Sequence, residues 1–323
     1  MALVTSEPAA AGSSPAAVVA PIAVSLDRVR RGFGEKPALV DLSISAPSGT
    51  ITVLLGPNGA GKTTAVRMIT GALSPEAGTV RVFGLDPSTD GEAVRRRCGV
   101  VAAKPALYDR LSGYDNLAYS AALYGVSNAG IGAAAERFGI AAALERQVGG
   151  YSTGMKTRLA LARSVLHDPE LLLYDEPTSG LDPESSVAVL DLIHEMADEG
   201  RTVIMCTHLL LEAEGLADQV VVLESGTDVI SGRPSELTRR YWPDTIVKIA
   251  ATDPAGLAAL RGKPGVLGVD LESEGPATVR LDDISRVPDL VDVLVAAGTR
   301  VTRVEPFTPT LEDLYFAVRG MRQ

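Results

Sequence analysis

Short apolar runs and longer helical patterns alternate along the first half of the chain. The runs Ala23–Leu26, Leu42–Ile44 and Ile51–Leu55 lie between Gly and Pro turn signals, and they predict short strands. From about Tyr114 to Val165 the pattern is helical and rich in Ala and Leu. An all-helical segment inserted among strands is unusual, so we expect residues 105–165 to form a helical subdomain with a function of its own.

Strand-like runs return after this helical segment. They lie at Leu171–Tyr174, Thr202–Cys206 and Gln219–Leu223, and the stretches Ser185–Asp198 and Leu209–Leu216 between them have helical periodicity. Strands that alternate with helices predict a mostly parallel sheet with crossover helices, which is the α/β class.

The pattern changes again around Trp242–Pro243, because a proline disfavours helix at the residue before it. The expected elements that follow are a strand (Thr245–Ala251), a helix (Pro254–Arg261), two strands (Gly265–Leu271, Ala277–Leu281), a helix (Val287–Ala297), a strand (Val301–Glu305) and a last helix (Thr310–Val318). This order predicts a ferredoxin-like α+β unit. We therefore expect a disordered tail at 1–20, a main domain at 21–240 and an accessory domain at 241–323.

Composition and charge narrow the function. The chain has 323 residues, enough for two domains, and 30 Lys and Arg against 40 Asp and Glu give a net charge of −10. This acidity argues against nucleic acid as the partner, since nucleic-acid phosphates need clustered positive charge. Two cysteines cannot make a disulfide framework, and no apolar run approaches the ~20 residues that a membrane span needs.

An apolar strand leads directly into a glycine-rich loop at residues 56–63, which reads G-P-N-G-A-G-K-T. In such a loop the glycines let successive backbone N–H groups point at phosphate oxygens, and the following helix adds the partial positive charge of its N-terminus. Lys62 is expected to bridge the β- and γ-phosphates, and the Thr63 hydroxyl to bind Mg²⁺. The predicted nucleoside-triphosphate site comprises Gly56, Pro57, Asn58, Gly59, Ala60, Gly61, Lys62, Thr63 and Thr64.

Two carboxylates follow the apolar run of residues 171–174. Asp175 is expected to hold Mg²⁺ through water, and Glu176 to polarise the attacking water as a general base.

Together with Tyr151-Ser152-Thr153-Gly154-Met155, these motifs resemble the ATP-binding subunits of ABC transporters. Ser152 and Gly154 match the family's L-S-G-G-Q signature, and residues 175–183 (D-E-P-T-S-G-L-D-P) are similar to its Walker B motif joined to its D-loop. Thr207-His208 resembles the switch histidine, and Phe33 falls where the family keeps an aromatic ring for adenine. The resemblance covers about residues 22–238 and implies a P-loop (RecA-like) ABC nucleotide-binding domain with an inserted helical subdomain.

The resemblance also implies how the site is completed. In the family two subunits close head to tail on two ATP molecules, and Ser152, Thr153 and Gly154 of one subunit complete the phosphate loop of the other. By the same resemblance, Asp182 of the D-loop is expected to be a nucleotide-binding residue. His208 would contact the γ-phosphate and the attacking water, and with Lys62 and Glu176 it makes up the expected catalytic set.

One departure from the family pattern concerns the chemistry. The family has a glutamine that touches Mg²⁺ and the water in the segment aligned with residues 98–105, and Ala103 stands at that position here. Lys104 is adjacent, either reaching the phosphates or lying solvated in its loop. Thr153 and Met155 also depart from the signature.

The segment Pro309–Tyr315 resembles the C-terminal extension of drug-export ABC ATPases of the daunorubicin-resistance type. The resulting expectation is an ATPase with ATP and Mg²⁺ as cofactors, acting as a homodimer on a polytopic membrane permease at the cytoplasmic face of the cell membrane. A regulatory, poorly hydrolytic cassette and a soluble ABC ATPase unconnected with transport are the alternatives.

Overall fold

The computed structural model describes residues 20–271 and 275–320, so the tail expected at 1–20 lies almost wholly outside the described residues. The strands are β1 (Ile22–Phe33), β2 (Lys36–Pro47), β3 (Ile51–Leu55), β4 (Ala77–Val82), β5 (Cys98–Val101), β6 (Leu171–Asp175), β7 (Thr202–Thr207), β8 (Gln219–Glu224), β9 (Thr227–Gly232), β10 (Thr245–Ala251), β11 (Val266–Asp270), β12 (Ala277–Leu281) and β13 (Val301–Phe307). The α-helices are α1 (Lys62–Ile69), α2 (Gly91–Arg96), α3 (Gly113–Tyr124), α4 (Ile131–Arg137), α5 (Thr153–Val165), α6 (Pro183–Asp198), α7 (Leu210–Leu216), α8 (Pro234–Tyr241), α9 (Val287–Ala296) and α10 (Leu311–Gly320).

The main domain is built on one mixed sheet with the strand order β4-β1-β2-β9-β8-β3-β7-β6-β5. Strands β3, β5, β6, β7 and β8 run parallel, whereas β1, β2 and β4 pair antiparallel at the other edge. Every residue of β3, β6 and β7 is buried, because helices cover both faces of this part of the sheet. Alternate residues of a strand therefore pack into two different hydrophobic cores. Val53 packs into the core that includes the inserted helices, and Leu54 packs into the core on the opposite face of the sheet.

The sequence predicted the parallel centre better than the antiparallel edge. Strands β1 and β2 are each 12 residues long and extend well beyond the expected runs. Their exposed face carries charged residues, and β1 has an irregular register between Leu26 and Val29, where Arg28 adopts a positive φ of 47°. These features interrupt the alternation of apolar and polar residues from which the strand lengths were predicted.

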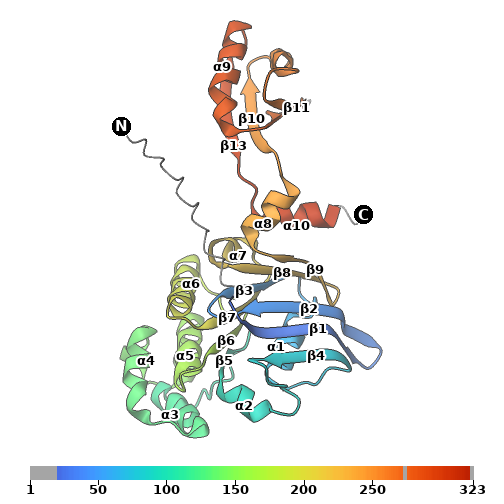
Figure 1. Ribbon diagram of the computed structural model, residues 1–323. Helices are drawn as coiled ribbons and strands as arrows, with labels where there is room; N and C mark the ends of the chain where they lie inside the picture. The colour runs from blue at the N-terminus through green and yellow to red at the C-terminus, as the bar shows by residue number, and fades with distance from the viewer. Residues whose placement is uncertain (1–19, 272–274, 321–323) are drawn as a thin grey trace, which may run out of the picture.

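The helices expected at about residues 105–165 group at one end of the sheet, away from β1, β2 and β4 (Figure 1). Helix α5 packs against β5 of the sheet and against α3 and α4. Its N-terminus therefore belongs to the helical subdomain, while its C-terminal part is anchored to the sheet.

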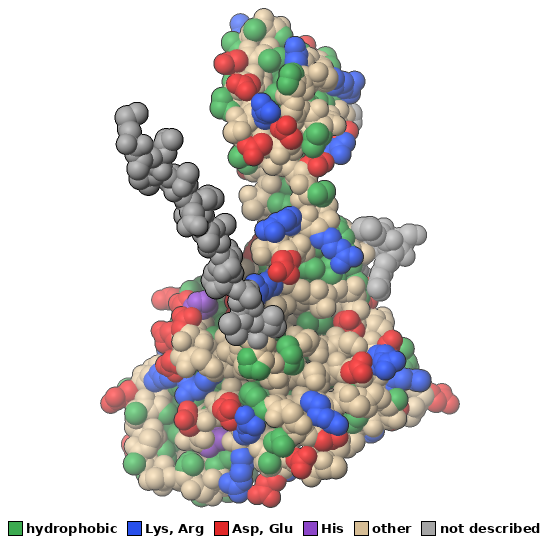
Figure 2. Space-filling model, in the orientation of Figure 1, with side chains coloured by type: hydrophobic (Ala, Val, Ile, Leu, Met, Phe, Trp, Pro, Cys, Tyr) green, Lys and Arg blue, Asp and Glu red, His purple; other side chains and the backbone are tan. Residues whose placement is uncertain are grey.

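The segment after α8 forms a second sheet with the order β11-β12-β10-β13, all of it antiparallel. When these strands are numbered 1 to 4 in chain order and the sheet is read from β13, they have the 4-1-3-2 order of a ferredoxin-like unit. The unit has its own apolar core. The expected first helix is a 3₁₀ segment, η4 (Pro254–Leu260). The unit forms a separate lobe on a narrow neck, with acidic and basic side chains interspersed over its surface (Figure 2).

The last helix does not belong to this lobe, although the expected boundary of 241–323 included it. Helix α10 packs against α7 and α8, and Leu311, Leu314 and Val318 are buried in the core of the main domain. These three residues are spaced at 3 and 4 positions, which gives one apolar helix face, and the face has its complement on the main domain rather than on the lobe. The ferredoxin-like lobe is therefore inserted between α8 and α10.

Candidate functional site

The glycine-rich loop leaves the carboxyl end of β3 and enters α1. Gly61 has a φ of +107°, and a Cβ built there would lie 2.5 Å from Leu39 Cδ2 and 2.9 Å from Ala38 O. A Cβ at Gly56 would lie 2.4 Å from Leu223 O. Both positions therefore require glycine, for the turn at Gly61 and for the close backbone approach at Gly56.

Three neighbouring strands bring the remaining expected groups to this loop. In the parallel registers Leu55 of β3 lies beside Thr207 of β7, and Cys206 of β7 lies beside Asp175 of β6. The residues after these strands consequently meet at one edge of the sheet, as ligand-binding groups do in open α/β sheets. Lys62, Glu176 and His208 converge there.

Lys62 and Glu176 form the centre of this cluster. Lys62 Nζ donates hydrogen bonds to Gly56 O (2.6 Å) and Pro57 O (3.4 Å), and it lies 3.2 Å from Glu176 Oε1. Glu176 Oε2 lies 2.7 Å from His208 Nδ1. Glu176 also holds a left-handed φ of +52°, which its backbone N–H supports by donating to Cys206 O at 2.9 Å. Such strained positions cluster at functional sites.

The residues expected to hold Mg²⁺ lie together beside this cluster. Thr63 Oγ1 donates to Asp175 Oδ2 at 2.7 Å, while the buried Asp175 Oδ1 has no hydrogen-bond partner. An unpaired buried carboxylate oxygen next to a hydroxyl fits a hard cation that keeps several of its waters. When bound, the ion would neutralise charge on the triphosphate, with Thr63 and Asp175 as its protein contacts.

A cleft of about 470 Å³ contains the phosphate loop and both carboxylates. Phe33, at the end of β1, stands on its rim with 46% of its surface exposed, and the Arg31 guanidinium lies 5.5 Å from its ring centroid. The ring is thus available for stacking on a flat ligand. The cleft is lined by Phe33, Lys36, Pro37, Ala38, Pro57, Asn58, Gly59, Ala60, Gly61, Lys62, Thr63, Thr64, Ala103, Asp175 and Glu176.

Sequence reasoning missed the contribution of β2. Lys36, Pro37 and Ala38 line the cleft opposite the loop, and Lys36 adds a cation beside Phe33. The sequence contains one hint of this part of the cleft, a lysine three residues after the candidate aromatic residue Phe33. A charged residue in a tight hairpin does not by itself indicate ligand binding.

The signature and D-loop residues lie outside this cleft. Ser152 caps α5, with its Oγ accepting a hydrogen bond from Met155 N at 3.2 Å, and the exposed Thr153 and the half-buried Gly154 begin the first turn. Asp182 caps α6, and the hydrogen bond from Ser185 N is the main cause that lowers the pKa of Asp182. The two caps are neighbours, because a Cβ at Gly154 would lie 3.6 Å from Ser185 Oγ. One chain therefore holds a phosphate-loop cleft and, separately, an exposed helix N-terminus.

Fold and cleft together define a P-loop nucleoside triphosphatase with an inserted helical subdomain. The family model described as "ABC transporter" matches residues 39–179. The daunorubicin resistance ATP-binding protein DrrA3 of Streptomyces coeruleorubidus is 34% identical over 94% of this chain and 97% of that protein. The Nod factor export ATP-binding protein I of Bradyrhizobium diazoefficiens is 34% identical over 93% of this chain and 97% of that protein.

A solved structure, described as an ATP-binding subunit of an ABC transporter, has a TM-score of 0.62 at 27% identity, over 68% of this chain and 92% of that one. The chain belongs to the ATP-binding proteins of ABC transporters, a family that hydrolyses ATP and works with membrane permeases. Within the described residues no helix is both long and apolar enough to span a bilayer.

Ala103 lies in the wall of the cleft with Asp175 and Glu176, so the position aligned with the family's glutamine faces the chemistry. A methyl group cannot hold a metal or orient water. We expect Ala103→Gln to raise kcat, by up to about 10²-fold because one misplaced contact can cost that much, or to lower the Mg²⁺ concentration for half-maximal activity. ATP affinity should change little, since water can replace one oxygen ligand of Mg²⁺. A Mg²⁺ titration of ATP hydrolysis measures both effects.

Lys104→Ala is the matched variant for this test. Lys104 is exposed and is not among the residues that line the cleft, so its removal should leave hydrolysis unchanged. A large loss with Lys104→Ala, together with no effect of Ala103→Gln, would show that the lysine has replaced the glutamine. If neither variant alters hydrolysis, this loop does not contribute to the chemistry.

Proposed function

We propose that this chain is the ATP-hydrolysing subunit of an exporter, that it acts as a homodimer, and that it drives a separate polytopic permease from the cytoplasmic face of the cell membrane. The observation that carries the proposal is the division of the site into two separate parts on one chain. Ser152, Thr153 and Gly154 present backbone N–H groups at an exposed helix N-terminus, which is suited to a phosphate. A second copy placed head to tail would bring that terminus onto the cleft.

In the dimer each residue would have a separate role. Lys62 and the loop N–H groups would bind the phosphates, and Phe33 would stack on the adenine. Glu176 would accept the proton of the attacking water, and His208, already paired with Glu176, would hold that water against the γ-phosphate. The names of the relatives above include drug resistance and Nod factor export, which supports a drug-like or lipid-like cargo.

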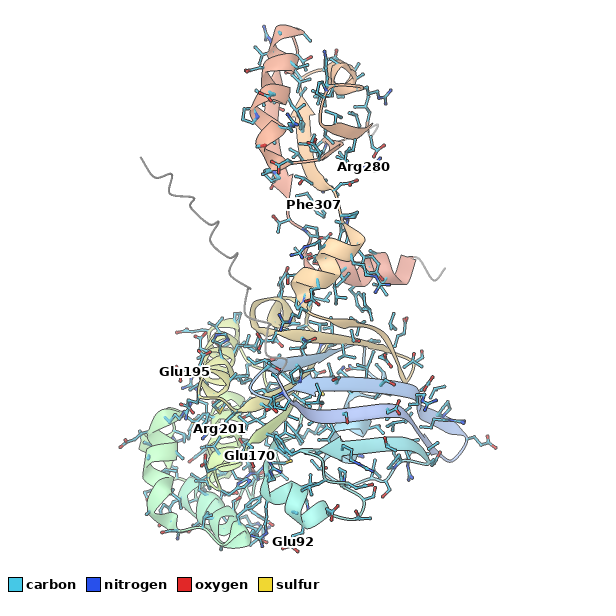
Figure 3. All side chains as sticks on the ribbon, viewed as in Figure 1. Glu92, Glu170, Glu195, Arg201, Arg280 and Phe307 are labelled. Carbon is cyan, nitrogen blue, oxygen red and sulfur yellow. The ribbon has the colours of Figure 1, made fainter. Side chains whose placement is uncertain are left out.

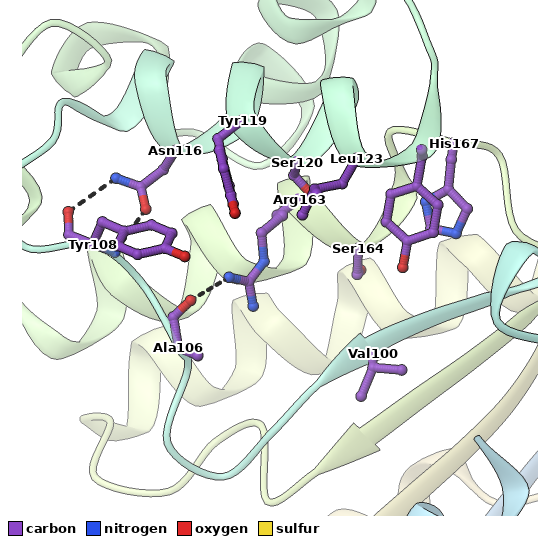
Figure 4. Close-up of a pocket in the computed structure, with 11 residues that line it drawn as sticks. Val100, Ala106, Tyr108, Asn116, Tyr119, Ser120, Leu123, Arg163, Ser164 and His167 are labelled. Carbon is purple, nitrogen blue, oxygen red and sulfur yellow. Dashed lines mark hydrogen bonds between the residues drawn. The ribbon is translucent and has the colours of Figure 1, made fainter. Parts of the chain in front are cut away.

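A second hollow suits the permease. It has a volume of about 290 Å³ and lies between α3, α5 and β5 (Figure 4). Tyr108 and Tyr119 pack edge to face on one side, Leu123 is 67% exposed, and His167 stacks on Tyr124 at the far end. Aromatic walls with an exposed leucine favour a protein partner over solvent.

Arg163 is the residue that would select which partner segment binds in this hollow. Its guanidinium points into the hollow, where it donates to Ala106 O at 2.5 Å, and burial lowers the pKa of Arg163. No acidic side chain lines the hollow, so the half-buried cation has no carboxylate partner among the described residues. A permease segment that carries an Asp or Glu would supply one, and we assign the hollow to such a segment.

Copurification from membranes tests both the transporter role and the hollow. Tagged parent protein should retain a polytopic membrane protein, identified by mass spectrometry. Arg163→Glu should reduce the yield by about tenfold or more, because it sets two carboxylates against each other in a half-buried site. Arg110→Glu is the control, since Arg110 is exposed on the same subdomain outside the hollow. Equal yields from Arg163→Glu and the parent would assign the permease to another surface, and no polytopic partner for the parent would contradict the transporter role.

A further inference from the structure

The ferredoxin-like lobe is joined to the main domain at two places that contact each other. The chain leaves the main domain after α8 and returns through β13 into α10 (Figure 1). In the neck the rings of Trp242 and Phe307 pack edge to face, with centroids 6.3 Å apart, and Lys248 Nζ lies 5.0 Å from the Phe307 centroid. Figure 3 shows Phe307 at the base of the lobe. A displacement of the lobe therefore acts on α8 and on α10 together.

Helix α10 is fixed to α7 by a polar contact as well as by its apolar face. Leu311 N, at the first position of α10, donates to Glu214 Oε1 of α7 at 3.2 Å. Thr310 and Asp313 complete the cap: Asp313 N donates to Thr310 Oγ1, and Thr310 N donates to Asp313 Oδ2. Glu214 thus places a negative charge at the positive end of a 10-residue helix, a favourable arrangement.

The first turn of α7 is fixed to Thr207, the residue that precedes His208. Thr207 Oγ1 donates to Glu212 Oε2, a carboxylate that is 9% exposed, at 2.8 Å, and it accepts a hydrogen bond from Leu209 N at 3.0 Å. His208 lies between these two anchored residues and contacts Glu176. Only Ala213 separates Glu212 from Glu214, so the Thr207 contact and the α10 contact share one short helix.

We propose that Glu214 is a positioning residue through which α10 sets the placement of α7 and His208, so that the ferredoxin-like lobe controls the rate of ATP hydrolysis. The control runs from the neck through α10 and Glu214 to α7, and it requires no contact between the lobe and the nucleotide. The proposal rests on the proposed role of His208 in hydrolysis.

The test follows the ring signals of His208 by NMR in the full chain, together with kcat and KM for ATP. The chain has three histidines, so a His208→Gln variant assigns the signal directly. Glu214→Ala should shift the His208 signal and lower kcat by about tenfold with KM unchanged, because a shift of about 1 Å away from the chemistry can cost on the order of 10²-fold. Glu214→Gln keeps an acceptor oxygen and should restore most of the rate. Glu312→Ala, which removes an exposed carboxylate from the first turn of α10, should change neither.

A double-variant cycle then tests the lobe. Phe307→Ala at the neck should shift the His208 signal in the parent and have little further effect in Glu214→Ala, since both act through one contact. Independent, additive effects would overturn the transmission through Glu214, and an unchanged His208 signal in Glu214→Ala would overturn the positioning role. If His208→Gln hydrolyses ATP at the parent rate, the proposed catalytic role fails, whereas the NMR result still decides whether α10 and His208 are connected.

Discussion

Glu176→Gln is expected to bind MgATP, to lose hydrolysis by roughly 10²–10⁴-fold and to accumulate as an ATP-bound dimer, because general-base catalysis contributes about that factor. Glutamine has nearly the shape of glutamate and can keep contacts to Lys62 and His208, but its amide cannot accept a proton from water. Glu176 also neutralises Lys62 at 3.2 Å, so the substitution removes a negative charge that competes with phosphate for that cation. Single-turnover hydrolysis, equilibrium ATP binding and light scattering measure the three effects.

Lys62→Ala provides the opposite phenotype. Lys62 is 5% exposed, and its Nζ is held at the loop by hydrogen bonds to two carbonyl oxygens. It is therefore expected to contact the phosphates of bound ATP before hydrolysis begins, and not only in the transition state. Its removal should abolish tight ATP binding, so no ATP-bound dimer of this variant should accumulate. Parent-rate hydrolysis by Glu176→Gln would show that another group is the base.

The phosphate-loop site was predictable because its determinants are local. Gly56 and Gly61 lie within one loop whose backbone geometry requires glycine at both positions, Lys62 follows directly, and an apolar strand precedes the loop. Asp175 ends one further buried strand and His208 follows another, so parallel pairing alone places them at the same edge. The topology therefore brings three separate motifs to one edge of the sheet, where the loop and the two carboxylates line one cleft and His208 contacts Glu176.

Other features depend on contacts that the sequence pattern does not encode. The apolar face of α10 is as compatible with the lobe as with the main domain, and only the structure shows that Leu311 and Leu314 enter the core beside α7 and α8. The hydrogen bond from Leu311 N to Glu214 joins residues 97 positions apart, beyond any helical periodicity. The length of β1 was hidden by the irregular register at Arg28.

The exposed N-terminus of α5 gives the last prediction, which concerns the homodimer. Gly154→Asp should abolish hydrolysis, because it adds a negative charge where the γ-phosphate of the partner's ATP would lie. The structure accommodates the new side chain, since a Cβ at Gly154 meets its nearest neighbour at 3.6 Å, an ordinary contact. The expected loss is therefore one of chemistry and not of folding. Gly132→Asp on α4, where a Cβ meets nothing within 4 Å, is the charge-matched control and should retain activity.

Mixing two inactive variants then distinguishes a composite site from a site within one chain. Lys62→Ala lacks a working phosphate loop and Gly154→Asp lacks a working signature, but a mixed dimer pairs the intact loop of one with the intact signature of the other. Equal amounts should recover about a quarter of the parent activity, because random pairing makes about half of the dimers mixed and each has one complete site of two. Each variant alone, at the same total concentration, should stay inactive. If the mixture is as inactive as its components, Ser152 and Gly154 do not complete the partner's site, and the exposed end of α5 must face a different molecule.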